Sequence, residues 1–226
     1  MRPQSGRWVL LLAALGLVAG AAGCGAIGDS QQVVDRARLV NDFAERLNHA
    51  GELTYTAEYR LSSGETARIA QAQHPIRAAV TYPGGKLITT AERTADCRTK
   101  TNTCTLTPPP SPGADPASGL LDLIGDGGLI LPTKVVGLLT AAALSSNAVI
   151  EQRDTTVGGE HAACVVVSGV ENAAASAFTA CITGAGVLGS FKGTVGGTDF
   201  DITLIRFQDT VPEDAFDLPA GATTAD

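Results

Sequence analysis

LTYTAEYRL, residues 53–61, is the stretch that decides the fold, because apolar and polar side chains alternate along all of it. The odd-numbered positions, including Tyr55, Ala57 and Tyr59, are apolar or aromatic, and the even-numbered positions are polar. Successive side chains of a β-strand point to opposite faces, so this period of two predicts a strand with one buried face. We expect the sheet of the molecule to begin here.

A helix is expected immediately before this strand. Apolar residues recur at helical spacing between charged ones, and Asp29 or Ser30 suits the N-cap. Gly51 suits the C-terminal end of the helix. The pattern predicts one amphipathic helix of about 20 residues, with an apolar face made of Val33, Ala37, Val40, Ala44 and Leu47.

Further alternating segments follow residue 61, separated by turn residues. Ser63-Gly64 and Pro83-Gly84-Gly85 suit tight turns between neighbouring strands. The spacing therefore predicts an antiparallel meander, with strands at about 65–73, 76–82, 86–93 and 103–107.

A proline-rich segment, residues 108–119, interrupts this meander, since it fits neither a helix interior nor a central strand. The most apolar part of the chain beyond Cys24 comes next, with LLDLI at 120–124 and LIL at 129–131. Pro132 suits the first turn of a helix, and apolar residues recur from there to about Leu144. We expect two short apolar helices inserted into a sheet protein.

Strands resume at Ala148 and continue to Phe207. The sequence Thr-Val-Gly-Gly occurs at 156–159 and again at 194–197, and predicts a hairpin turn at each place. The order of elements indicates the α+β class, with antiparallel strands, an N-terminal helix and inserted helices.

The first 23 residues have the composition of an export signal. Arg2 and Arg7 precede an apolar run from Trp8 to Ala22, which leads through small residues to Cys24. As a helix this run would span roughly 22 Å, short of the ~30 Å hydrocarbon core of a membrane. The ending Ala-Ala-Gly-Cys resembles a bacterial lipoprotein signal, which implies that Cys24 becomes the lipid-bearing N-terminus. Secretion after an Ala-x-Ala site and retention as an anchor stay open as alternatives.

The four cysteines beyond Cys24 indicate disulfide bonds, because an even number in an exported chain favours pairing. Three pairings are open, and the nearest-neighbour one, Cys97–Cys104 with Cys164–Cys181, suits strands joined by short connections. A metal site is the alternative, but no C-x-x-C motif occurs and the three histidines are far apart in sequence. We expect neither a metal nor a cofactor.

Composition and motifs narrow the function classes. The formal net charge of −7 argues against binding to nucleic acid. The 4% aromatic content, compared with 44% hydrophobic content, predicts a mainly aliphatic interior.

Two motifs are candidates for a cofactor site or for catalysis. Gly184–Gly189 matches G-x-G-x-x-G, but strand and turn are predicted where a dinucleotide site needs a helix. His161 with Asp154 is the best acid–base pair, and no nucleophile motif accompanies it. We therefore expect that the protein is not an enzyme.

This order of elements, with FDLPAGA at residues 216–222, resembles the lipoprotein-carrier superfamily (LolA/LolB-like), including the LppX/LprG-type lipoproteins of actinobacteria. The resemblance covers residues 30–222. It implies a strongly curved antiparallel half-barrel with lid helices over its open side and an apolar cavity for acyl chains. The four cysteines depart from the pattern of that group, so the identity of the ligand does not transfer.

The resulting hypothesis is an envelope lipoprotein, anchored through Cys24 to the extracytoplasmic face of the cell membrane, that binds lipid or a lipidated ligand for carriage or presentation. Its parts would be a signal (1–23), a tether (24–29), the half-barrel (30–222) and a tail (223–226). The alternative is a sensor or scaffold that binds another envelope protein without lipid transport. The candidate lipid-binding residues are Leu53, Tyr55, Tyr59, Ile69, Val80, Ile88, Leu123, Leu129, Ile130, Val135 and Leu139.

Overall fold

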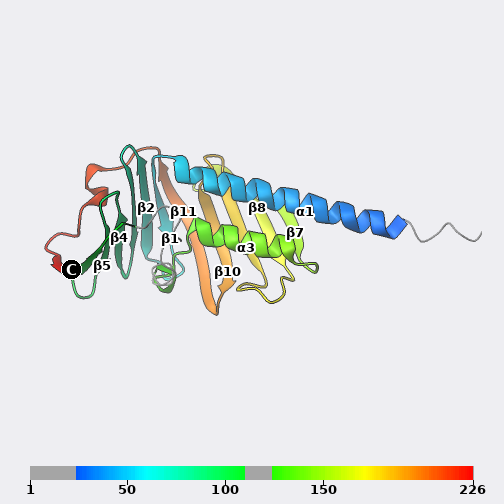
Figure 1. Ribbon diagram of the computed structural model, residues 1–226. Helices are drawn as coiled ribbons and strands as arrows, with labels where there is room; N and C mark the ends of the chain where they lie inside the picture. Colours follow the sequence, from blue (N-terminus) through cyan, green and yellow to red (C-terminus); the bar gives the residue numbers. More distant parts are fainter. Residues whose placement is uncertain (1–23, 110–123, 226) are drawn as a thin grey trace, which may run out of the picture.

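The computed structural model describes residues 24–109 and 124–225, which form a large curved sheet with helices across one face (Figure 1). The helices are α1 (Cys24–His49) and α3 (Pro132–Leu144), with 3-10 turns η1 (Ala50–Glu52) and η2 (Glu213–Phe216). The strands are β1 (Tyr55–Arg60), β2 (Thr66–Gln73), β3 (Ile76–Tyr82), β4 (Gly85–Thr89), β5 (Thr94–Arg98), β6 (Thr103–Thr107), β7 (Val149–Val157), β8 (Glu160–Ser168), β9 (Phe178–Thr183), β10 (Leu188–Val195), β11 (Thr198–Gln208) and β12 (Thr223–Ala225).

The twelve strands lie in the order β12-β6-β5-β4-β3-β2-β1-β11-β10-β9-β8-β7. The meander forms one half and the strands after α3 form the other, so β1 and β11 meet near the middle. Neighbours pair antiparallel except β12 and β6, which run parallel. The predicted α+β fold, a curved and unclosed antiparallel sheet with an N-terminal helix, is confirmed.

The central strand β1 shows why residues 53–61 decide the fold. Tyr55, Ala57 and Tyr59 are buried in the core on one face, whereas Arg60 is exposed. Thr56 points to the other face and is also buried, where its hydroxyl donates a hydrogen bond to a backbone carbonyl of the C-terminal segment at 2.8 Å. The outer face of this strand is therefore covered at Thr56 and open at Arg60.

Helix α1 begins at Cys24, earlier than the predicted start at Ser30, so the residues expected as a tether are helical. No proline interrupts the segment, and the hydrogen bonding of a helix can continue across its two glycines. The helix packs by its predicted apolar stripe, burying Val40 and Leu47 together with the adjacent Phe43. Among the helices of the described residues, none combines the length and the hydropathy needed to cross a bilayer.

Two strand predictions are corrected by the structure. The strand expected over residues 86–93 ends at Thr89, because the hydroxyl of Thr90 accepts backbone N–H groups of Glu92 and Arg93 and turns the chain. At the other end, the expected tail over 223–226 instead supplies β12 beside β6. Three-residue strands with no alternation carry too little pattern for sequence-based prediction.

Both predicted disulfide bonds are present. Cys97 lies directly opposite Cys104 on β5 and β6, and Cys164 lies opposite Cys181 on β8 and β9. Each bond joins neighbouring antiparallel strands, which agrees with the nearest-neighbour pairing.

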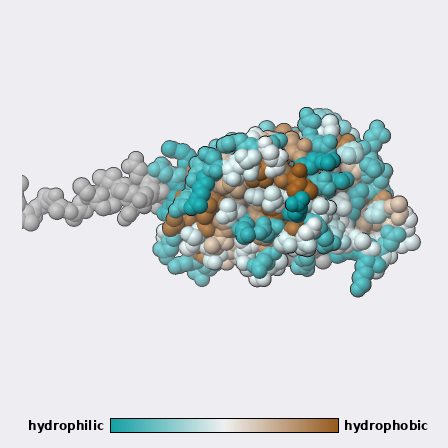
Figure 2. All heavy atoms as spheres, turned by 180° about the vertical axis from the view of Figure 1, so that it is seen from behind, coloured by the Kyte–Doolittle hydropathy of each residue, from teal (hydrophilic) through white to brown (hydrophobic). Residues whose placement is uncertain are grey.

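The two faces of the sheet are covered by different parts of the chain. The face toward α1 and α3 carries the main core, here called the helix-side core. The opposite face of β2 to β6 carries a smaller cluster, the outer cluster, beneath residues 211–222. Figure 2 shows the side away from the helices, where hydrophobic residues gather across the middle and hydrophilic ones surround them. The outer cluster consists of Ala70, Ala79, Ile88, Ala95, Cys97 and Cys104, packed against Leu106, Val211, Ala215, Phe216, Leu218 and Ala222.

Candidate functional site

Most of the predicted lipid-binding residues come together in the helix-side core. Leu53 and Val80 are half-buried at its margin, and the others are almost fully buried. Leu123 lies outside the described residues. The residues brought together are Leu53, Tyr55, Tyr59, Ile69, Val80, Leu129, Ile130, Val135 and Leu139.

Ile88 is predicted for the same face, and that prediction is wrong. The register pairs Ile88 with Ala79 and Leu87 with Val80, so Leu87 takes the position on the helix side. Ile88 packs in the outer cluster instead. Two adjacent apolar residues give no alternation, so the face of each is fixed only by the pairing register.

An apolar pocket of about 260 Å³ lies at the boundary between the helix layer and the sheet. Its walls come from residues 125–131, the start of α3, and the hairpin between β10 and β11. We call it the rim pocket, and its lining residues are Gly125, Asp126, Leu129, Ile130, Leu131, Lys134, Ala174, Val195, Gly196, Thr198 and Phe200.

The turn at residues 125–128 positions the inner wall of the rim pocket. The backbone at Gly127 lies against the ring of Tyr82, so that a Cβ there would approach a ring carbon to 2.7 Å. Gly128 adopts a φ of +82°, a left-handed conformation that favours glycine. The turn closes with a 2.8 Å backbone hydrogen bond from Gly128 to Gly125 and leads directly into the buried side chains of Leu129 and Ile130.

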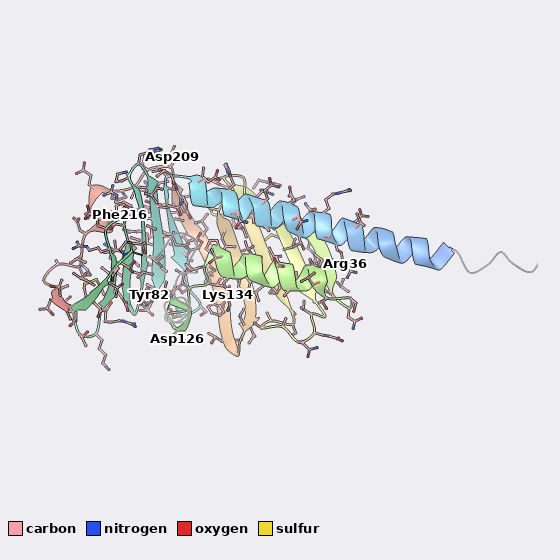
Figure 3. The ribbon with its side chains drawn as sticks, in the orientation of Figure 1. Arg36, Tyr82, Asp126, Lys134, Asp209 and Phe216 are labelled. Atoms are coloured by element: carbon pink, nitrogen blue, oxygen red, sulfur yellow. A yellow bond between two sulfur atoms is a disulfide. The ribbon has the colours of Figure 1, made fainter. Side chains whose placement is uncertain are left out.

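Two charged side chains stand at the pocket boundary. Asp126 comes from the turn and Lys134 from the first turn of α3, and Figure 3 labels both near the start of that helix. The side chains of Asp126 and Lys134 are both exposed. Phe200 forms part of the opposite wall and packs edge-to-face against Phe191, with ring centroids 6.3 Å apart. The site therefore combines an apolar wall with one cation and one anion at its boundary.

The two tyrosines of β1, Tyr55 and Tyr59, are uncharged members of the helix-side core. The hydroxyl of Tyr59 donates to the carbonyl of Leu188 at 2.9 Å. Burial raises the pKa of Tyr55 to about 12 and raises the pKa of Tyr59 well above its ordinary value of 10. Both side chains are therefore neutral at physiological pH and behave as part of an apolar interior.

The motifs considered for catalysis or cofactor binding lie on neighbouring strands and in a turn. His161 Nε2 and Asp154 Oδ1 are 3.6 Å apart, but both side chains are about two-thirds exposed or more, where an ion pair contributes little. Gly184–Gly189 forms a turn into β10, and the register shifts between Leu188 and Ser190, as in a bulge. Within residues 24–109 and 124–225, no three metal-ligating side chains gather.

A second hollow, about 390 Å³ in volume, lies on the outer face beneath the C-terminal segment, and no sequence pattern predicts it. Lys86 donates to the carbonyl of Asp217 at 2.7 Å, and burial lowers the pKa of Lys86, opposed by the charges of Asp217 and Asp214. The guanidinium of Arg77 lies 4.3 Å from the ring centroid of Phe216. The only sequence signal for this packing is FDLPAGA, which carries no periodicity.

Comparison with solved structures finds chains of similar fold, among them the two that follow. No protein-family model matches the sequence, and no curated protein matches it. An uncharacterized conserved protein from Thermus thermophilus is similar at a TM-score of 0.48 and 12% identity, over 82% of this chain and 97% of that one. MucB is similar at a TM-score of 0.49 and 13% identity, over 81% of this chain and 64% of that one.

Proposed function

We propose that this protein binds lipid acyl chains, and that the rim pocket is where a chain is held. The observation that carries the proposal is an apolar pocket at the boundary of the helix layer and the sheet, beside an uncharged core and with charged groups at its boundary. Acyl chains need apolar walls, and lipid headgroups need polar partners close to the opening.

The size of the pocket limits what it can hold. Its volume of about 260 Å³ lies slightly below the roughly 300–1,000 Å³ of typical small-molecule sites. Each methylene removed from water contributes ~0.8 kcal/mol. The pocket therefore suits part of one chain, with Lys134 available to an anionic headgroup and Asp126 to a cationic one.

The proposal includes attachment to the outer face of the cell membrane through a lipid on Cys24. Two or more acyl chains anchor a protein stably where one does not. Because α1 starts at Cys24, the anchor would join a helix directly. The proposed function is passive binding for carriage or presentation, without catalysis.

The decisive experiment combines lipid extraction with a pocket-filling variant. The full chain is purified from its native membrane, and bound lipid is identified by mass spectrometry. Ala174→Trp should fill the pocket from an exposed lining position and reduce protection of a fluorescent acyl probe about tenfold. Ala177→Trp is the matched control, since Ala177 is exposed near the same loop and does not line the pocket. Absence of bound lipid, or equal probe binding by both variants, would contradict the proposal.

Attachment is tested separately with Cys24→Ala. We expect the variant to leave the membrane fraction while the wild type stays there, as followed by immunoblotting. A variant that remains membrane-bound would show that Cys24 is not the anchor, without affecting the lipid-binding measurement.

A further inference from the structure

Strand β7 ends the sheet order, so one of its two edges faces away from β8. Across the described part of the chain, β7 pairs with β8 alone. Both faces of β7 are exposed along residues 151–156. A long exposed edge strand presents backbone N–H and C=O groups to which another strand can bind.

The disulfide on the neighbouring strands shows which backbone groups point outward. The Cα atoms of Cys164 and Cys181 are 3.9 Å apart, as in the narrow, non-hydrogen-bonded pairs of an antiparallel ladder. Cys164 therefore directs its backbone groups to β7, where its partner is Arg153. Because the pattern alternates, Gln152 and Asp154 direct their N–H and C=O groups to the open edge.

The side chains of β7 are self-complementary in charge. Glu151 and Arg153 lie on the same face and form an exposed ion pair at 2.8 Å. A second copy laid antiparallel, with the two-fold axis at Gln152, brings Glu151 opposite Arg153 of that copy and Arg153 opposite Glu151. A two-fold axis at Glu151, Arg153 or Asp154 would instead place that residue opposite the same residue of the second copy, so that like charges would face each other. Charge and hydrogen-bond alternation therefore favour the same register.

We propose that two copies of this chain associate through β7, in an antiparallel two-fold pairing centred on Gln152. The pairing joins the two sheets through about six backbone hydrogen bonds and two Glu151–Arg153 ion pairs. The helices of both copies lie on the same face of the joined sheet. The same register places Ile150 opposite Asp154, an unfavourable contact, so the association is weak and reversible. It is independent of the lipid-binding proposal.

Charge exchange tests the register directly. The full chain is co-produced with two different tags, solubilised, and captured through one tag, and the other tag is quantified. Glu151→Arg alone or Arg153→Glu alone should reduce capture of the second copy about tenfold, because each creates two like-charge contacts. The double variant E151R/R153E should restore capture, and so should co-production of the two single variants with each other. Equal capture in all combinations, or no recovery in the double variant, would overturn the proposal.

Cross-linking tests the position of the axis. Gln152→Cys should form a disulfide with itself in a second copy, because Cα atoms of a hydrogen-bonded pair lie about 5.5 Å apart, within disulfide range. Thr66→Cys, an exposed position on β2, is the matched control. Dimer formation by Gln152→Cys well above that of Thr66→Cys supports the pairing, and equal yields would contradict it. Circular dichroism of each variant verifies that it is folded.

Discussion

The half of the sheet formed by β7 to β11 packs against two helices, whereas the half formed by β2 to β6 also packs against the C-terminal segment on its other face. The first contact uses large side chains such as Phe178, Phe191 and Ile202. The second uses small residues, three alanines and two cysteines, with Ile88 as the largest buried residue, and is supported by a disulfide and by the Arg77–Phe216 contact. Small side chains bury little apolar area, so directional contacts contribute more there.

The difference between the halves implies a division of roles. The helix-side core supplies most of the hydrophobic stabilisation and holds α1 and α3 on the sheet. The outer cluster fixes residues 211–222 without determining the fold. Changes in the first are expected to affect the whole molecule, and changes in the second are expected to affect mainly its C-terminal segment.

The largest expected effect distinguishes the two packed regions. Leu139→Ala should lower the free energy of unfolding by about 3–5 kcal/mol, because Leu139 is a fully buried residue of α3 and the cavity left by the substitution cannot collapse. Ile88→Ala is the comparison and should cost about 2–3 kcal/mol, since the C-terminal segment can settle into the space. Urea unfolding measures both. A larger loss of unfolding free energy for Ile88→Ala than for Leu139→Ala would contradict the proposed division of roles between the two packed regions.

The two disulfides give the next comparison. Replacing Cys164 and Cys181 together by alanine should cost about 3 kcal/mol, and replacing Cys97 and Cys104 about 2.5 kcal/mol, because the bridged residues are 17 and 7 positions apart. Thermal unfolding of both double variants tests this order. A much greater loss from the shorter loop would indicate that the outer cluster supports the whole sheet.

A smaller effect is expected at Tyr59, which links β1 to β10 through its bond to Leu188. Tyr59→Phe should cost about 1–3 kcal/mol, because the buried carbonyl loses its partner. Tyr55→Phe is the matched control, since it removes a hydroxyl from the same face of β1 without breaking that bond. Equal losses in denaturant unfolding would show that the bond to Leu188 contributes nothing specific.

The smallest effect is expected in the C-terminal segment. Phe216→Leu should weaken the contact with Arg77 by about 1 kcal/mol and increase hydrogen exchange of residues 211–222, with little change in global unfolding. Phe207→Leu is the control, because Phe207 stacks on Tyr55 at 5.9 Å and should affect global unfolding instead. Unchanged exchange in Phe216→Leu would mean that other contacts hold the segment.

Local patterns were sufficient for much of the fold. The alternation at residues 53–61, the apolar stripe of α1, Pro132 at the start of α3 and the repeated Val-Gly-Gly turns each have a short-range physical cause, and each corresponds to an element of the structure. The disulfide pairing followed from the same local logic, because strands joined by short connections lie side by side.

What sequence reasoning missed depends on contacts between distant parts of the chain. The pairing of β1 with β11, the face of Ile88 and the packing of Phe216 on Arg77 are set by register and by segments far apart in sequence. Leu129 and Ile130 were correctly grouped with the β1 aromatics, but the pocket beside them also needs Phe200 and Val195, which no local pattern connects to them.

Strand β12 gives the two ends of the sheet different properties. It is three residues long and parallel to β6, so it offers a new strand far less backbone than the nine residues of β7 at the opposite end. A two-fold contact uses the same edge of both copies and leaves only their β12 ends outward. Growth by edge addition would then stop at two molecules, and the short strand would act as a terminator against fibre formation.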